Sequence, residues 1–514
     1  MIKTIRNTGE SGVIVDVTPD SIAENAWTDA SNIRFIDGSA IQAFGYSEIY
    51  ATPGVAPYHV FPVTIGGARY WVYVGAAKVY CVNGTTHTDL SPAGSYTGAA
   101  NAWTSCVLGG IPLINAGNTI DLPQSWDLVL ANNFGALANW PASTYCKALR
   151  AYRNYLVALG VTKSAISYPF MVKWSHPADP GAVPGSWDQT DATKDAGEFD
   201  LSEGQDVIVD GLQLRDSFMI YKESSIWRMN YVGGDYVMGF KKVVGQSGAL
   251  SRNCITELDG VHVVMTGDDL IIHDGNQPTS VLDGVARKHL MSSIDSTNYA
   301  TTFVVKNPYM SEVMVFYPNS STLPNKALVW NYHNKTVSFR DFLDGVSITH
   351  ASSGLVESGL SDTWASDPAP WDSDTTRWSQ SDFTPSSSRV VLAGQSSTKL
   401  FLLDASSSWD GTQITANIER RGLNLDAPNK RKLIRSIRPR IYGNDGSTVT
   451  VSVGYADSPY DDPTYTSSTY TIGTTISCDF LVEGRYLAVK FANGTAYQWR
   501  LDSFDIEYEI TGDW

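Results

Sequence analysis

The chain has 514 residues, of which 37 are basic and 53 are acidic, so its net charge is −16. This balance argues against a protein that wraps duplex DNA by neutralising phosphates, although an acidic wall suits a surface past which DNA slides without binding. Hydrophobic residues make up 43% of the chain, enough for substantial cores, and the length predicts more than one domain unless the chain is a large propeller.

The sequence shows no membrane or secretory segment. It lacks a run of about eighteen apolar residues, so no transmembrane helix is expected. The opening residues Met1–Arg6 lack the apolar stretch of a signal peptide, and we therefore expect folding in a cytoplasm. The cysteines stand singly, which predicts reduced, buried thiols and no zinc site: Cys81, Cys106, Cys146, Cys254 and Cys478.

Short apolar runs separated by turn residues fill most of the chain and predict an all-β protein. No long segment has 3.6-residue periodicity, and the 43 glycines punctuate the runs. Short helical turns are expected only at residues 128–136 and 285–293. Residues 1–50 carry fewer hairpin signals, and we expect them to supply an outer strand that closes the first repeat onto the last.

Between residues 51 and 409 one unit recurs: an apolar strand, a tight polar turn and a second apolar strand. In residues 217–231, for example, two runs rich in aromatic and aliphatic residues flank the turn Lys222–Ser225. The units are spaced by about 37 to 78 residues, with several values near the 40–50 of propeller blades. They begin at Ala68, Ser105, Arg153, Asp216, Gly260, Ser311 and Arg389. This repetition predicts an irregular β-propeller of about six to eight blades, with a stack of β-sandwiches as the alternative.

A polar segment at residues 352–388 interrupts the repeats. Trp364, Trp371 and Trp378 are spaced by seven, but the prolines in Asp367–Pro370 forbid a helix there. The segment is expected to be a long ordered loop, and loops of this length are usually functional or lie at interfaces. A solvated outer loop without a role is the alternative.

Residues 410–514 have longer strands with alternating polarity, which predicts a separate C-terminal β-sandwich. Its first part is rich in basic residues: Arg420, Arg421, Lys430, Arg431, Lys432, Arg435, Arg438 and Arg440. These side chains form either a solvated strand face or a docking surface for an acidic partner or a phosphate.

Sequence motifs for catalysis are not found, and we predict no catalytic, metal-binding or cofactor-binding residue. Gly245–Gly248 is one residue short of G-x-S-x-G, and no H-E-x-x-H or phosphate-binding glycine motif occurs. Asp268, Asp269, His273 and Asp274 are close in sequence, but neighbouring strand residues face opposite ways. A glycosidase with paired carboxylates is a further alternative, although the sequence singles out no such pair.

Four phrases in the chain resemble structural tail proteins of short-tailed bacteriophages. Trp27–Gly38 resembles the "W-x-x-x-x-N-V-R-F-x-x-G" opening of tail-hub and nozzle-like proteins. Trp174–Trp187 resembles their "W-S-D-P-x-x-P-x-x-W" blade, with His176 where the pattern more often has Asp. Tyr221–Gly234 resembles the next blade, and residues 484–507 resemble the C-terminal sandwich of these proteins.

The resemblance implies a tail nozzle or tail tubular protein of the virion, made in the host cytoplasm. Six copies would form a ring that retains the genome and guides its ejection, without sequence-specific DNA binding. The implied partners are other copies of the chain, the portal and adaptor proteins, and tail fibres or a needle. The alternatives are a head-completion or DNA-stabilising plug and a propeller that binds host surface glycans.

These roles define three sets of candidate residues. Trp174, Trp187 and Trp227 are expected to pack within or between blades. The expected subunit contacts lie in the basic run: Arg420, Arg421, Lys430, Arg431 and Arg435. The expected lumen-lining residues are acids of the polar segment: Glu357, Asp362, Asp367, Asp372 and Asp374.

Overall fold

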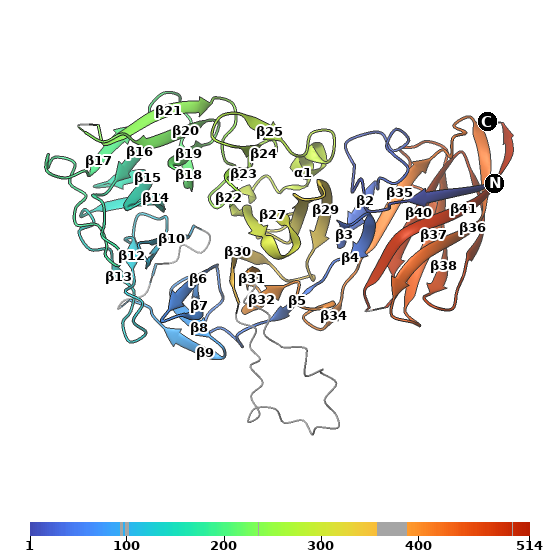
Figure 1. Cartoon of the computed structure of the whole chain (residues 1–514), viewed down its shortest axis with the longest axis horizontal. Coiled ribbons are helices and arrows are strands. Elements are labelled where there is room, and N and C mark those ends of the chain that lie inside the picture. Colours follow the sequence, from blue (N-terminus) through green and yellow to red (C-terminus); the bar gives the residue numbers. More distant parts are fainter. Residues whose placement is uncertain (93–95, 98–101, 235, 357–387, 496, 514) are drawn as a thin grey trace, which may run out of the picture.

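The computed structural model describes residues 1–92, 96–97, 102–234, 236–356, 388–495 and 497–513 (Figure 1). Almost all regular structure in these residues is β-strand, which confirms the all-β class. The described residues contain one α-helix, α1 (Arg287–Ser293), and two short 3-10 helices, η1 (Tyr299–Thr301) and η2 (Pro308–Met310). None of these helices is long and apolar enough to span a membrane.

Only one of the two expected helical turns is present. Helix α1 lies within residues 285–293 and confirms the first expectation. The helical turn expected at residues 128–136 is wrong. There the Asp127 carboxylate accepts a hydrogen bond from the Val129 amide at 3.0 Å, and the Trp126 indole donates to the Asn132 carbonyl at 3.0 Å. These bonds fold the segment into a loop that leads to a short strand, because side chains compete for the backbone groups of a helix.

The described residues form seven four-stranded antiparallel blades of a propeller (Figure 1). Five blades are separate sheets, and blades 6 and 7 are parts of larger sheets. Blade 1 is β6 (His59–Ile65), β7 (Ala68–Val74), β8 (Val79–Asn83) and β9 (Thr86–Asp89). Blade 2 is β10 (Thr104–Leu108), β11 (Ile111–Asn115), β12 (Gln124–Ser125) and β13 (Gly135–Ala136). Blade 3 is β14 (Thr144–Tyr152), β15 (Tyr155–Lys163), β16 (Ile166–Trp174) and β17 (Gly197–Asp200). The first strand of each blade is the innermost.

The next three blades repeat this arrangement. Blade 4 is β18 (Ile208–Leu214), β19 (Ser217–Lys222), β20 (Ile226–Tyr231) and β21 (Met238–Val244). Blade 5 is β22 (Ile255–Leu258), β23 (Val261–Met265), β24 (Leu270–His273) and β25 (Pro278–Ser280). Blade 6 is β26 (Phe303–Asn307), β27 (Glu312–Tyr317), β28 (Lys326–Asn331) and β29 (Thr336–Asp341).

Blade 7 joins the two ends of the propeller. Its strands are β30 (Ile348–Leu355), β31 (Ser388–Gly394), β32 (Lys399–Leu403) and β5 (Tyr46–Glu48). Strand β5 precedes blade 1 in the chain, and it pairs antiparallel to β32 with Ser47 opposite Leu402. The Tyr46 ring packs on Phe401 at 4.6 Å between centroids. The short strands β33 (Ser408–Trp409) and β34 (Thr412–Gln413) extend the same sheet.

Each of the seven units found in the sequence lies in a different blade, so the predicted propeller is confirmed with seven blades. Apolar strands such as β27, which is buried along its whole length, form the middle of a blade. Tight turns with positive φ angles connect them, as at Gly260 (φ 82°) between β22 and β23. The spacing between units is irregular because the loops between strands differ in length.

A β-sandwich follows the propeller, as the sequence predicts. One sheet has the order β3 (Ile33–Ile36), β4 (Ser39–Gln42), β41 (Trp499–Asp513), β36 (Lys430–Gly443) and β39 (Cys478–Gly484), with β1 (Ile2–Arg6) also paired to β41. The other contains β2 (Asp29–Ser31), β35 (Asn417–Leu423), β40 (Tyr486–Asn493), β37 (Thr448–Ala456) and β38 (Thr464–Thr471). Trp27 fills the space between the sheets, with its ring 6.3 Å from Phe491 and 6.2 Å from Phe504.

The first fifty residues are divided between the two parts of the molecule. Only β5 closes the propeller, whereas β1 to β4 belong to the sandwich through their pairing with β41 and β35. The expected outer closing strand within residues 1–50 is therefore confirmed as β5, but the rest of this segment belongs to the sandwich, which is larger than the expected residues 410–514. Its apolar interior needs this N-terminal part, because Trp27, Ile33 and Phe35 are buried there.

One continuous sheet connects the propeller to the sandwich. Strand β2 pairs in parallel with β29 of blade 6 and antiparallel with β35 of the sandwich. The resulting nine-stranded sheet runs from β26 to β38. A single hydrophobic cluster also extends from blade 6 into the sandwich. The two parts are therefore joined by backbone hydrogen bonds and by a shared core.

Candidate functional site

Four buried charges hold the propeller against the sandwich. The Arg34 guanidinium, on β3, donates to both carboxylate oxygens of Glu312 at 2.6 and 2.8 Å and to Asp404 at 2.8 Å. Arg340 of blade 6 donates to the other Asp404 oxygen at 3.0 Å, and the Asn307 amide donates to Asp404 at 2.9 Å. We call these five residues the junction cluster. Two guanidiniums and two carboxylates balance, so the cluster has no net charge.

Burial and charge pairing shift the pKa of Asp404, in the junction cluster, in opposite directions. The charged side chains are at most 5% exposed. Burial alone would raise the pKa of Asp404, but the Arg34 and Arg340 guanidiniums outweigh it and lower this pKa to about 2. Asp404 therefore stays ionised at any physiological pH. Removing one member would leave an unpaired charge in a dry site, which is the costly case for buried ion pairs.

A second polar group occupies the axis of the propeller. Strands β6, β10, β14, β18, β22, β26 and β30, one from each blade, line a cavity of about 200 Å³. The Arg150 guanidinium donates to both oxygens of Asp210 at 2.8 and 2.6 Å, to Asn253 at 2.9 Å and to the Ser105 carbonyl at 3.1 Å. Because one side chain joins the inner strands of several blades, Arg150 stabilises the ring from within.

Two histidines complete this axial group. His59 and His350, on the inner strands of blades 1 and 7, stack with ring centroids 3.8 Å apart. Burial, and secondarily the Arg150 charge, lowers the pKa of His350 to about 3. Burial also lowers the pKa of His59 well below its usual value, with contributions from His350 and Arg150. Both imidazoles are therefore neutral at pH 7, and they meet where the first and last blades join.

A third group of buried polar side chains lies between blades 4 and 5. The Tyr221 hydroxyl is 2.7 Å from His262 Nδ1 and 2.7 Å from His273 Nε2. Burial lowers the pKa of each of these histidines to about 4. His273 is one of the residues that the sequence placed near Asp268, Asp269 and Asp274. In the fold its partner is Tyr221, whereas Asp274 caps a turn by accepting the Asn276 amide at 3.0 Å. Within the described residues, no three metal-ligating side chains converge.

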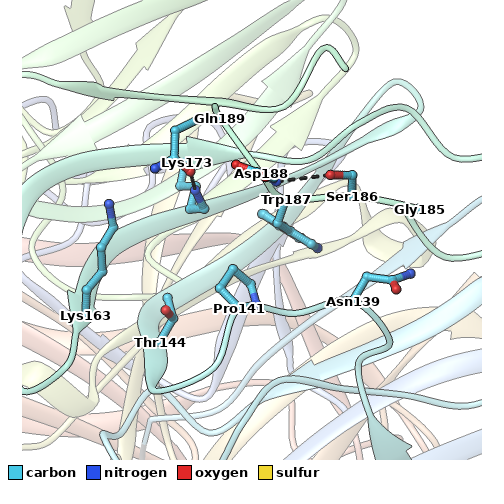
Figure 2. Close-up of a pocket in the computed structure, with 10 residues that line it drawn as sticks. All are labelled: Asn139, Pro141, Thr144, Lys163, Lys173, Gly185, Ser186, Trp187, Asp188 and Gln189. Atoms are coloured by element: carbon cyan, nitrogen blue, oxygen red, sulfur yellow. Dashed lines mark hydrogen bonds between the residues drawn. The ribbon is translucent and has the colours of Figure 1, made fainter. Parts of the chain in front are cut away.

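A cavity of about 470 Å³ lies on blade 3 and is lined by residues from three segments (Figure 2). The ends of β14 and β15 provide Thr144 and Lys163, and β16 provides Lys173. The loop after β16 contributes residues 185–189, and the loop before β14 contributes Asn139 and Pro141. We call this cavity the blade 3 pocket. It contains Trp187, a residue that the sequence analysis singled out.

The three selected tryptophans are buried, at 7% exposure for Trp174, 2% for Trp187 and 7% for Trp227. The Trp174 indole donates to the Asp195 carbonyl at 2.7 Å and lies against Gly197, where any Cβ would be 2.3 Å from the ring. Trp174 and Trp227 belong to one hydrophobic cluster between blades 3 and 4. Trp187 packs edge-on against Trp140, with ring centroids 4.6 Å apart.

Trp227→Phe should lower the free energy of unfolding by about 1–2 kcal/mol, because it removes buried ring atoms and the hydrogen bond from the indole to the Ser225 hydroxyl at 3.3 Å. Urea denaturation followed by circular dichroism measures this change. Tyr236→Phe is the control, because Tyr236 is 83% exposed. The free energy of unfolding of this variant should differ from that of the wild type by less than about 0.5 kcal/mol. Unchanged stability together with lost binding to host cells would instead make Trp227 a receptor contact.

The basic run of the sandwich is largely paired within the chain. Arg420 is 2% exposed and donates to the Pro19 carbonyl at 2.6 Å. Arg421 bonds to Asp462 at 2.5 Å, Arg431 to Glu483 at 3.2 Å and Arg435 to Glu509 at 2.7 Å. Lys430 begins β36 and is half-buried. The outward-facing arginines of β36 therefore pair with acids of the neighbouring strands β39 and β41, so this face alternates in charge and is not a uniformly basic patch.

The proposed lumen-lining acids lie outside the described residues. Glu357, Asp362, Asp367, Asp372 and Asp374 all fall between the described parts of blade 7, which end at 356 and resume at 388. Their expected position at a rim or subunit contact stays a prediction.

Sequence analysis missed the axial group, the junction cluster and the lysines of the blade 3 pocket. A usable signal exists for some of them, because Asp210 and Lys173 are charged residues at buried positions, and Arg150 at a half-buried position, of largely apolar strands. A charge at such a position needs a partner. The sequence does not identify that partner, since Arg150 and Asp210 belong to different blades.

No protein-family model and no curated protein matches the chain. Among solved structures, it is similar to the extracellular domain of the putative one-component system BT4673 from B. thetaiotaomicron, at 10% identity and a TM-score of 0.41, covering 88% of this chain and 58% of that one. It is also similar to YCF48 bound to D1 peptide, at 9% identity and a TM-score of 0.37, covering 70% and 97%. The β-propeller domain of the Trilobed protease from Pyrococcus furiosus is similar at 11% identity and a TM-score of 0.33, covering 71% and 96%.

Proposed function

We propose that the chain is a structural protein of a short bacteriophage tail. In this proposal, six copies form a ring-shaped nozzle or tube that retains the genome and guides its ejection. The proposal assigns no catalytic step to the chain.

The observation that carries the proposal is the position of the opening phrase Trp27–Gly38, which resembles phage tail proteins. Its Trp27 fills the sandwich, its Ser31 pairs with Phe339 of blade 6, and its Arg34 enters the junction cluster. The residues that carry the resemblance therefore join the propeller to the sandwich. A ring subunit that transmits force to its neighbours requires a rigid connection between its two domains.

The interior of the propeller favours a channel between copies over one through each copy. The axial cavity of about 200 Å³ is bordered by the Arg150 and Asp210 pair and the stacked histidines. Duplex DNA is far too wide for such a space. In the proposed ring, DNA would pass along surfaces of several subunits, and the net charge of −16 would limit its binding there.

The sandwich offers an edge at which copies can associate. Strand β39 is the last strand of its sheet, and its outward-facing Leu481 is 80% exposed. Ile476, in the loop before β39, is 83% exposed. An exposed edge strand with apolar side chains is a ready template for pairing with another chain. We therefore place the subunit contact along β39.

Leu481→Glu should weaken ring formation, because it puts a charge where apolar contact and edge pairing are expected. Mass photometry of the purified full chain is expected to show a hexamer, which at six times 56.0 kDa is about 336 kDa. In the variant, we expect the hexamer fraction to fall at least about tenfold at the same concentration, because all six contacts of the ring are weakened.

Ile166→Glu is the matched control, because Ile166 is 58% exposed on blade 3, outside the sandwich. Cryo-EM averages of the wild-type ring then report whether its lumen admits duplex DNA. A closed disc without a lumen would support a plug instead. A chain that stays monomeric both alone and with isolated portal and adaptor proteins would contradict the proposal.

A further inference from the structure

The blade 3 pocket contains two ammonium groups that converge on one carboxylate. Lys163 Nζ donates to Glu198 at 2.5 Å, and Lys173 Nζ donates to the same oxygen at 3.1 Å. Lys173 also donates to the Gln189 side-chain oxygen at 2.7 Å. Asp188 at the rim is exposed, and its Oδ1 accepts the Thr190 amide and hydroxyl. The two ammonium groups therefore share the carboxylate of Glu198, and the exposed Asp188 at the wall of the pocket also acts on Lys173.

Lys173 is the less compensated of the two lysines. Its side chain is 3% exposed, whereas that of Lys163 is 26% exposed. An ammonium group has three N–H donors, and the bonds to Gln189 and Glu198 use two of them. Burial lowers the pKa of Lys173, and the bond to Glu198 offsets this only in part. A further anionic acceptor beside Lys173 would therefore stabilise its charged form.

Trp187 forms part of the wall of the pocket, and its indole donor is buried behind that wall. The residue is 2% exposed, and its indole Nε1 has no hydrogen-bond partner among the described residues. Figure 2 shows the Trp187 ring between the strand that carries Lys173 and the loop of Pro141 and Asn139. Because this N–H is buried as well as unpaired, a ligand in the pocket would meet the wall that Trp187 forms and not its donor.

The other walls combine apolar and amide groups. Pro141 offers an apolar surface, and Asn139, whose amide N–H donates to the Pro184 carbonyl at 3.2 Å, keeps its side-chain oxygen as an acceptor. The volume of about 470 Å³ is in the range of small-molecule sites, which pair apolar walls with a few oriented polar groups. A sugar ring with several hydroxyls fits polar groups that lie apart on the pocket walls better than a bare anion does, because an anion would contact the lysines alone.

We propose that the blade 3 pocket binds a sugar residue that carries a carboxylate, such as a uronic acid unit of a polysaccharide. The carboxylate contacts Lys163 and Lys173 beside Glu198, the ring packs at the Trp187 and Pro141 wall, and a ring hydroxyl donates to the Asn139 side-chain oxygen. This binding is independent of the proposed ring, because every group in it belongs to one chain.

Saturation-transfer difference NMR with the purified full chain tests the proposal on three probes. Methyl β-D-glucuronide should bind with a Kd on the order of 1 mM, as expected for about a dozen non-hydrogen atoms. Methyl β-D-glucoside lacks only the carboxylate and should bind at least about tenfold more weakly. Acetate at equal concentration should displace little of the glucuronide.

Variants locate the binding in the pocket. Lys173→Met and Lys163→Met should each weaken glucuronide binding about tenfold or more, and Trp187→Phe by a few-fold. Lys242→Met is the control, because Lys242 bonds to Glu203 at 3.4 Å on blade 4 and should leave binding unchanged. Lys163→Met keeps the test valid if Lys173→Met fails to fold, since Lys163 is partly exposed.

Each opposing result overturns the proposal. Equal affinity for glucoside and glucuronide would remove the role of the carboxylate. Displacement of the glucuronide by acetate at equal concentration would leave an anion site without sugar recognition. Absence of glucuronide binding, or binding that both lysine variants retain, would show that the pocket is not such a site.

Discussion

Asp404→Asn is expected to lower the free energy of unfolding by about 3–5 kcal/mol, the range measured when one partner of a buried ion pair is removed. The change leaves Arg34 and Arg340 with only the carboxylate of Glu312 in a site that is almost fully buried. Since the cluster lies where propeller and sandwich meet, the variant should also expose protease sites near residue 404. Urea denaturation and limited proteolysis measure the two effects.

Asp89→Asn is the matched control for this prediction. It removes the same charge from a surface pair, in which Lys78 and Asp89 are 43% and 41% exposed and 2.8 Å apart. Exposed ion pairs contribute about 0–1 kcal/mol to stability, so the free energy of unfolding of this variant should remain close to that of the wild type. Equal losses in the two variants would mean that the junction cluster is no more important than a surface ion pair.

Acidification from pH 7 to pH 5 is expected to destabilise the protein strongly. In the unfolded chain a histidine has a pKa near 6.5, whereas burial holds those of His262 and His273 at about 4 and that of His350 at about 3. The unfolded state therefore binds more protons in this range, and stability falls as the pH drops from about 6.5 towards 4. Each independent histidine contributes about 2 kcal/mol of this loss at pH 5.

His350→Phe tests the origin of this pH dependence. A phenyl ring keeps the stacking on His59 and the contact with Phe303, whose ring centroid is 5.7 Å away. The difference in unfolding free energy between pH 7 and pH 5 should shrink by about 2 kcal/mol, because one titrating group is removed. His333→Gln, at an exposed position, controls for the loss of an imidazole. Equal stability of the wild type at both pH values would refute the expectation.

The sequence predicted the propeller because its signal is local. Each blade contains a strand, a turn and a strand that are adjacent in the chain, so the alternation of apolar and polar residues reveals them one by one. The exact number of blades was not predictable, since irregular loops such as residues 175–196 of blade 3 disturb the spacing. The role of residues 1–50 was only partly predictable, because β1, β2 and β4 pair with strands that lie more than 300 residues away in the chain.

The functional residues were harder to predict because each site combines distant segments. Arg34, Glu312 and Asp404 meet from three regions of the chain, and no local pattern connects them. The same holds for His59 and His350 at the axis. The tryptophans were recognisable because large aromatic residues beside proline and glycine turns usually pack in a core. The unpaired indole N–H of Trp187 and the nearby lysines became visible only in the fold.

The division of the first fifty residues has a consequence for synthesis on the ribosome. Strand β5 needs β32, and the sandwich partners of β1, β2 and β4 are strands that begin after residue 416. About 350 residues must be translated before the first of these partners emerges, which takes roughly 20 to 70 seconds at 5–20 residues per second. During that time the nascent N-terminal segment exposes Trp27, Ile33 and Phe35 without their native contacts. The propeller can therefore close once β32 has left the ribosome, whereas the sandwich must wait for β41 at residues 499–513, so a translation product truncated between the two would have a closed propeller without a complete sandwich.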